Sequence, residues 1–265
     1  MQTVISLIAA AGIATASPAA VEVVPLTPQG KWAVDYGLTS CLATRSYGDP
    51  KTPVVLGFRP SLNDSTIRLI LVQNDGYLEP RHAPVTVAGL KTTGLRYSMK
   101  GTKRRVTWID LSRTDFDLAV SGKSLRIVGE GVNVDLTLVG MASVSKALQT
   151  CNTDLRAYWN ADEAGLTRIA TQAKPLMSPA KFVTSEDYPA QALRESKGGR
   201  TRVSLLIDDQ GTAKDCVVEE HSGVATIDAQ TCIMILKRGK FAPAQDGAGK
   251  PVKSHLSYSF NWKIG

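Results

Sequence analysis

Residues that build catalytic and metal-binding sites are scarce in this sequence. Its three histidines, His82, His221 and His255, stand far apart, and none has HExxH or HxxxH spacing. The four cysteines form no CxxC pair, which argues against a zinc site and against a thioredoxin-type redox centre. A phosphate-binding loop and a GxGxxG fingerprint are also missing. The sequence therefore predicts a protein that is not an enzyme and that has no metal and no cofactor.

Long apolar runs are missing too. The apolar segment at residues 1–16 is shorter than the roughly 20 residues that a membrane-spanning helix needs. It carries no charged side chain and ends with the small residues Ala14 and Ala16, at the positions that a signal peptidase reads. We predict a signal peptide cleaved after Ala16 and a periplasmic protein; retention of the segment as an inner-membrane anchor is the alternative. Export excludes nucleic acid as a partner, although the formal net charge is +7.

The cysteine count is low but even, and disulfides persist in exported proteins. Three pairings of four cysteines exist, and one pair in each half of the chain is the simplest. In that arrangement Cys41 pairs with Cys151 and Cys216 pairs with Cys232. Both disulfides are expected to be structural.

Short segments of alternating apolar residues, separated by glycine-rich turns, fill residues 32–141. Such alternation is typical of an antiparallel sandwich or barrel. Between residues 143 and 159 the apolar residues recur at three- and four-residue intervals, which predicts a helix. The sequence thus predicts a β-rich domain with a closing helix over residues 28–159, followed by a linker over residues 160–185 that lacks a clear period.

Basic residues concentrate between residues 81 and 109, where no acidic residue occurs. The densest group is Lys100, Lys103, Arg104 and Arg105. A basic face in the cell envelope could bind peptidoglycan or anionic lipid. A solvated sheet face is the alternative reading of the same pattern.

The last 80 or so residues predict a small α-β-β-α-β domain over residues 186–265. A short helix is expected from Glu186 to Ser196, with Pro189 in its first turn and Gly198-Gly199 after its end, and Gly211 turns a hairpin. A second helix follows, whose buried face is expected to hold Ile227, Ala229, Cys232, Ile233 and Leu236.

The closing strand of this domain alternates without a break. Its expected core face holds Leu256, Tyr258, Phe260 and Trp262, and its expected wet face holds Ser257, Ser259 and Asn261.

The ordered motifs of this domain resemble the carboxy-terminal domain of the TonB family. The matching residues are Tyr188-Pro189, Ala192, Gly199, Asp208, Gly211, Ser222-Gly223, Ile227-Asp228-Ala229, Phe241-Ala242-Pro243-Ala244, Gly249 and Pro251-Val252, followed by the aromatic closing strand. The resemblance implies that an extended segment of an outer-membrane transporter is accepted as an added strand. The open edge of the strand from Leu256 to Trp262 is then the candidate partner-binding surface. Typical transducers of the family have an uncleaved membrane helix and a proline-rich spacer, in place of which this sequence has a signal-like segment and a β-rich domain.

The sequence as a whole predicts an α+β chain and two hypotheses for its function. The first is a periplasmic TonB-family protein that binds an outer-membrane transporter or another envelope protein by β-strand addition, in energy-coupled transmembrane transport. The second is a structural envelope protein that binds peptidoglycan or anionic lipid through its basic β domain, with the TonB-like domain as a folding or homodimer-forming module.

Overall fold

The computed structural model describes residues 23–74, 76, 79–99, 101–178, 181–182 and 184–264. The expected signal peptide, residues 1–16, and Lys100 of the basic group lie outside the described residues. Within the described part of the chain, no helix has both the length and the apolar character that crossing a membrane requires.

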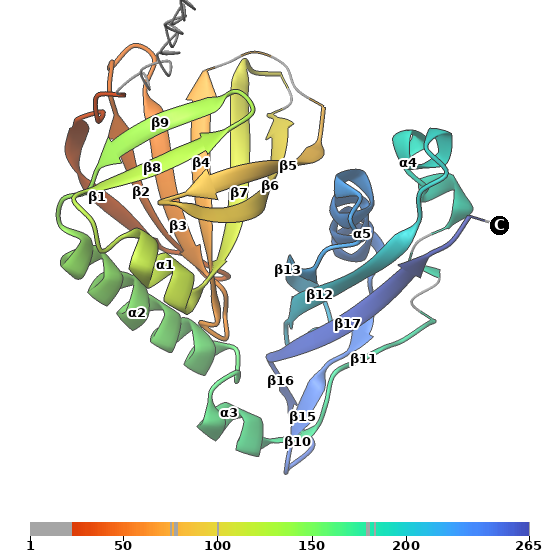
Figure 1. Ribbon diagram of the computed structural model, residues 1–265. Helices are drawn as coiled ribbons and strands as arrows, with labels where there is room; N and C mark the ends of the chain where they lie inside the picture. The colour runs from red at the N-terminus through yellow and green to blue at the C-terminus, as the bar shows by residue number, and fades with distance from the viewer. Residues whose placement is uncertain are drawn as a thin grey trace, which may run out of the picture.

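The first part of the chain is one antiparallel sheet with the strand order β1-β2-β3-β4-β7-β6-β5-β8-β9 (Figure 1). Its strands are β1 (Pro28–Tyr36), β2 (Cys41–Tyr47), β3 (Val54–Pro60), β4 (Thr66–Asn74), β5 (Arg81–Val87), β6 (Leu90–Ser98), β7 (Arg104–Ser112), β8 (Ser124–Gly129) and β9 (Val132–Thr137). Side chains that alternate along these strands fill a shared interior; in β4, for example, Ile67, Leu69 and Leu71 are buried. We call β1 to β9, with the helices α1 and α2, the barrel domain.

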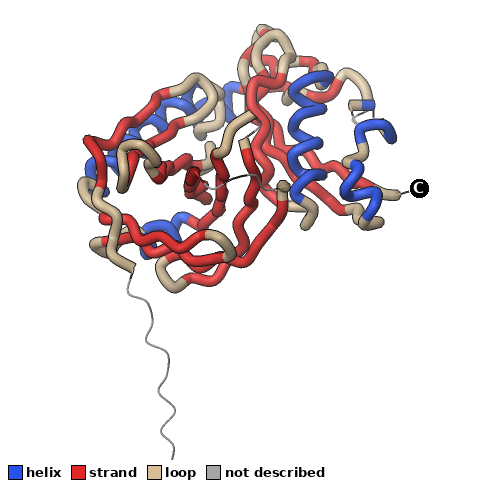
Figure 2. Tube along the Cα trace, turned by 90° about the horizontal axis from the view of Figure 1, so that it is seen from above, coloured by secondary structure: helices blue, strands red, loops and turns tan. Residues whose placement is uncertain are grey.

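The two ends of this sheet meet through Leu26, just before β1. Leu26 forms an isolated parallel bridge with Leu136 of β9. Its amide donates to the carbonyl of Asp135 at 2.7 Å, and its carbonyl accepts from the amide of Thr137 at 3.1 Å. Seen from above, the strands curl around a common interior (Figure 2). The sequence left sandwich and barrel open, and these bonds decide for a barrel because they join the first strand region to the last.

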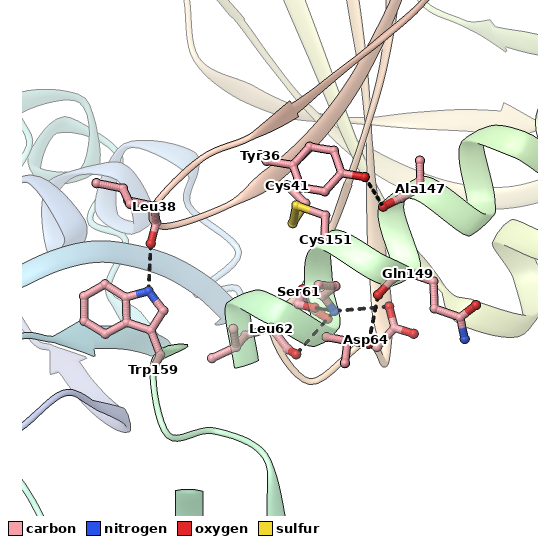
Figure 3. Close-up of a disulfide and its surroundings, with 12 residues drawn as sticks. Tyr36, Leu38, Cys41, Ser61, Leu62, Asp64, Ala147, Gln149, Cys151 and Trp159 are labelled. Carbon is pink, nitrogen blue, oxygen red and sulfur yellow. Dashed lines mark hydrogen bonds between the residues drawn. A yellow bond between two sulfur atoms is a disulfide. The ribbon is translucent and has the colours of Figure 1, made fainter. Parts of the chain in front are cut away.

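The helix α2 (Met141–Tyr158) covers strands β1 to β3, while the short α1 (Arg113–Ala119) packs on β7. The expected helix over residues 143–159 is present, but it begins earlier, after Gly140 with its left-handed φ of 78°. Cys151 on the buried side of α2 is bonded to Cys41 of β2 (Figure 3). The indole of Trp159 donates to the carbonyl of Leu38 at 2.8 Å and fixes the end of the helix. The helix is thus held to the barrel at its middle and at its end.

The second part of the chain, from α3 (Glu163–Arg168) to β17 (Ser254–Trp262), we call the small domain. Its main sheet has the order β13-β12-β17, from β12 (Gly199–Ile207), β13 (Ala213–Glu220) and β17. The helices α4 (Ala190–Arg194) and α5 (Ala225–Arg238), the 3-10 helix η2 (Ser185–Asp187) and the short strands β14 (Phe241–Ala242), β15 (Ala244–Asp246) and β16 (Pro251–Val252) complete it.

The segment expected as a linker contributes to this domain. Ile169–Thr171 forms β10, which pairs with β15, and Lys174–Pro175 forms β11, which pairs with β14. Ala173 and Phe182 are buried in the core of the small domain. Strands this short leave no periodic pattern in the sequence. Their pairing partners lie about 70 residues further along the chain, so no local signal marks them.

The buried face of α5 differs from the expected one. Ile233 and Leu236 are 52% and 44% exposed, while Asp228 and Thr231 are buried. Both buried polar residues have partners: the Asp228 carboxylate accepts from Thr201, and the Thr231 hydroxyl accepts from the indole of Trp262. A face predicted from apolar residues alone was wrong here because hydrogen-bonded polar side chains occupy part of the interface.

Candidate functional site

The strand β17 lies at the edge of the main sheet of the small domain (Figure 1). It pairs with β12 along its whole length, from Ser254 opposite Ile207 to Trp262 opposite Gly199. Among the described residues no strand pairs with its other side. Every second residue of such an edge directs its N–H and C=O groups outward, so the edge can accept another extended chain.

Side chains hold this edge strand from both faces. On the core face, the indole of Trp262 donates to Thr231 of α5 at 2.9 Å and meets the ring of Tyr188 edge-on at 5.2 Å. On the polar face, Ser259 accepts from Arg200 at 3.1 Å and Ser257 donates to Glu219 at 3.2 Å. The strand is therefore held in place from both of its faces.

The small domain was compared with models of known protein families. Residues 184–264 match the family model of the Gram-negative bacterial TonB protein C-terminal. These residues of the small domain form a TonB C-terminal domain, and the small domain is called by that name from here on. A search of curated proteins gave no match to the chain.

The polar face of the TonB C-terminal domain rests on the barrel domain. Arg59 of β3 forms an ion pair with Asp215 of β13 at 2.6 Å, and both side chains are largely buried. Leu206 of β12 is 4% exposed and packs into the hydrophobic core of the barrel domain. A cavity of about 430 Å³ remains beside these contacts, and its lining includes Arg202 and His255. The two domains thus share an interface of mixed apolar and charged character.

A chain of charged groups crosses this interface. Arg68 of β4 donates two hydrogen bonds to the Asp110 carboxylate of β7, at 2.7 and 2.8 Å. Asp110 Oδ2 lies 3.5 Å from Nε2 of His221, in the turn between β13 and α5. His221 Nδ1 in turn lies 2.9 Å from Oδ2 of Asp228. His221 is therefore placed between one carboxylate from each domain.

These contacts set the protonation of the three groups. Hydrogen bonding to Asp110 and then to Asp228 raises the pKa of His221 to about 9. Burial pushes the pKa of Asp110 upward, but the hydrogen bonds from His221 and Arg68 outweigh it and hold that pKa well below its usual range. Burial of Asp228 is likewise outweighed, first by the hydrogen bond with His221, then by the nearby His82 ring and the amide of Ser222, so its pKa is also strongly lowered. At neutral pH Asp110 and Asp228 are therefore carboxylates, and His221 between them is an imidazolium.

The fold brings together two histidines that the sequence places far apart. The rings of His82, on β5, and His221 meet edge-on at 5.2 Å, and both lie beside Asp228. Spacing rules for metal sites detect ligands on one helix or one hairpin, and these three residues come from separate elements. His255, in contrast, lies outside this cluster and contacts Ser204 at 2.6 Å.

Three members of the basic group lie among the described residues. Lys103 and Arg104 are exposed at the turn between β6 and β7, whereas Arg105 is half-buried. Arg104 and Arg105 are neighbours in a strand, so their side chains leave opposite faces of the sheet. Of the other cations in this stretch, Arg81 is paired with Glu130 and Arg96 is 2% exposed.

The four cysteines form the two expected disulfides. The second one joins Cys216 of β13 to Cys232 of α5 and lies within the TonB C-terminal domain. Together with the Cys41–Cys151 bond it leaves no free cysteine among the described residues. Disulfides of this kind are consistent with an oxidising compartment.

Proposed function

We propose that this protein is a periplasmic binding protein that captures an extended segment of an outer-membrane transporter, or of another envelope protein, by strand addition along β17. The observation that carries the proposal is the unpaired edge of β17 within a TonB C-terminal domain. The activity proposed is binding, and we propose no catalytic role for the chain.

Strand addition suits the chemistry of this edge. Main-chain N–H and C=O groups of β17 supply affinity for any extended segment, and alternate side chains fix the register. Ser257, Ser259 and Asn261 give one face of the strand a polar character. A bound strand would continue the sheet β13-β12-β17 by one member.

The anchoring of β17 supports a further part of the proposal, that binding serves energy-coupled transport. A strand that is pulled must pass the force to the body of the domain. β17 is bonded along its length to the central strand β12, and α5 is joined to β13 through Cys216–Cys232. A force applied through the partner strand would therefore be borne by the sheet and the disulfide-linked helix α5 rather than by β17 alone.

A titration with a synthetic peptide from the periplasmic amino-terminal segment of a transporter tests the binding mode. The full mature chain is labelled with ¹⁵N, and amide shifts are followed by NMR. We expect the largest shifts along residues 254–262, with the outer strand β13 as the internal control because it forms the other edge of the same sheet. The matched control peptide carries proline at every second position, which removes the N–H donors that strand addition needs.

Two results would contradict the proposal. Shifts confined to β13 or to the cavity at the domain interface would place the partner elsewhere. Equal binding of the proline-containing peptide would show that backbone pairing does not carry the affinity.

A further inference from the structure

Three metal-ligating side chains converge where the barrel domain meets the TonB C-terminal domain. They are His82 of β5, His221 of the turn after β13, and Asp228 of α5, and their ligand atoms all lie within 4.8 Å of one another. Asp228 Oδ2 is 2.9 Å from His221 Nδ1 and 3.6 Å from His82 Nε2. Each domain thus supplies at least one member of the cluster.

The ring nitrogen Nε2 of His82 is available to bind a ligand. Its Nε2 atom is buried and has no hydrogen-bond partner among the described residues. A buried polar atom of this kind normally costs free energy unless a partner satisfies it. The atom lies 3.6 Å from Asp228 Oδ2, a distance too long for a hydrogen bond.

Neighbouring hydrogen bonds orient the other two side chains of the cluster, those of Asp228 and His221. Asp228 Oδ1 accepts from Thr201 Oγ1 and from the amide of Ser222, both at 2.9 Å, which leaves Oδ2 for the two histidines. His221 directs Nδ1 toward Asp228 and Nε2 toward Asp110. A carboxylate behind a histidine is the usual outer partner of a metal-ligating imidazole.

We propose that His82, His221 and Asp228 bind one divalent cation of the zinc type. Two imidazole nitrogens and one carboxylate oxygen form a donor set that suits zinc rather than magnesium or calcium. The separations of 2.9 and 3.6 Å from Asp228 Oδ2 are both short enough for atoms that share one ion through bonds of about 2.0–2.1 Å.

The cation takes the place of a proton. Without metal, the proton on His221 Nδ1 is shared with Asp228 Oδ2; on binding, the ion occupies that position and the proton passes to solvent. His82 and His221 line a cavity of about 360 Å³, together with Trp108 and Thr93 among others, so water can complete the coordination. The bound ion joins β5 of the barrel domain to α5 of the TonB C-terminal domain.

Equilibrium dialysis of the tag-free, metal-stripped mature chain against zinc chloride tests the site, with bound zinc counted by mass spectrometry. We expect one equivalent of zinc per chain. His82→Leu and His221→Asn each remove one ligand and should weaken binding at least about 100-fold. Asp110→Asn removes the outer partner of His221 and should weaken it about 10-fold. His255→Asn is the matched control, because His255 lies outside the cluster, and should bind zinc as the wild type does.

Thermal unfolding gives a second readout. Zinc should raise the Tm of the wild type and of His255→Asn and leave the Tm of His82→Leu unchanged. If His82→Leu fails to fold, His221→Asn carries the same comparison. Less than stoichiometric binding by the wild type, or wild-type affinity in either folded ligand variant, would overturn the proposal.

Discussion

Arg59 of β3 and Asp215 of β13 are separated by 156 residues in the chain and lie with Nη2 and Oδ2 2.6 Å apart. Their side chains are only 23% and 20% exposed, so water screens this pair less than a surface pair. The pair therefore stabilises the contact between the two domains as well as each strand that carries it.

A double-mutant cycle measures this contribution. Arg59→Ala, Asp215→Ala and the double variant should give a coupling of about 1 kcal/mol in the free energy of unfolding. The exposed pair of Arg81 and Glu130, 42% and 67% exposed and within the barrel domain, is the control and should couple by only about 0.3 kcal/mol. Equal coupling in the two cycles would show that the domain interface does not shield the first pair.

Leu206 supplies the apolar part of the same interface. Leu206→Ala should lower the free energy of unfolding by about 2–4 kcal/mol, because a nearly buried leucine leaves a cavity in the core of the barrel domain. Leu166→Ala, at a leucine that is 53% exposed on α3, should cost about 0.5 kcal/mol or less. Urea unfolding followed by circular dichroism compares them. Similar costs for both would argue that the domains separate in solution.

The two disulfides should differ in their effect on stability. Cys41 and Cys151 close a loop of sequence separation 110, and Cys216 and Cys232 close one of separation 16. In the chain-entropy model these loops correspond to upper values of about 5 and about 3 kcal/mol. The double variant Cys41→Ala/Cys151→Ala should thus unfold at lower urea concentration than Cys216→Ala/Cys232→Ala. The reverse order would contradict the loop-length argument.

Asp187 gives the stability a dependence on acid pH. Hydrogen bonding from Arg238, and next from the backbone of Thr184, lowers its pKa from 3.8 to about 2. Because the folded-state pKa is the lower one, the stabilisation is complete above the unfolded-state value and is lost as the pH falls through about 2.

The comparison of wild type with Asp187→Asn tests this dependence. The variant should be less stable at pH 7, and the difference should shrink between pH 4 and pH 2. Free energies of unfolding measured across this range provide the test, with Asp209→Asn, at an exposed acid in the turn between β12 and β13, as the control. A difference that stays constant down to pH 2 would rule out the ion pair as its source.

Local patterns in the sequence were sufficient for several features. The alternation of Leu256, Tyr258, Phe260 and Trp262 predicted the two faces of β17, since side chains in a strand leave opposite faces in turn. The helical period between residues 143 and 159 placed Cys151 toward the sheet, where it meets Cys41. Both inferences need only a few neighbouring residues.

Features that depend on distant partners were missed. Ile233 and Leu236 were expected in the core, but Thr231 and Asp228 take part of that face because Trp262 and Thr201 provide hydrogen bonds. No local period reveals such partners. The strands β10 and β11 were missed for the same reason, since each is too short to alternate and exists only through its pairing.

The sequence by itself determined the types of the longer elements, the TonB-like order of motifs and the apolar face of the edge strand, because each follows from local periodicity and turn chemistry. Only the tertiary structure decided that Leu26 closes a barrel, that Leu206 joins the two domains, and that His82 and His221 meet at Asp228. These are contacts between residues far apart in the chain, and their geometry is fixed by the packing of whole sheets rather than by any neighbouring residue.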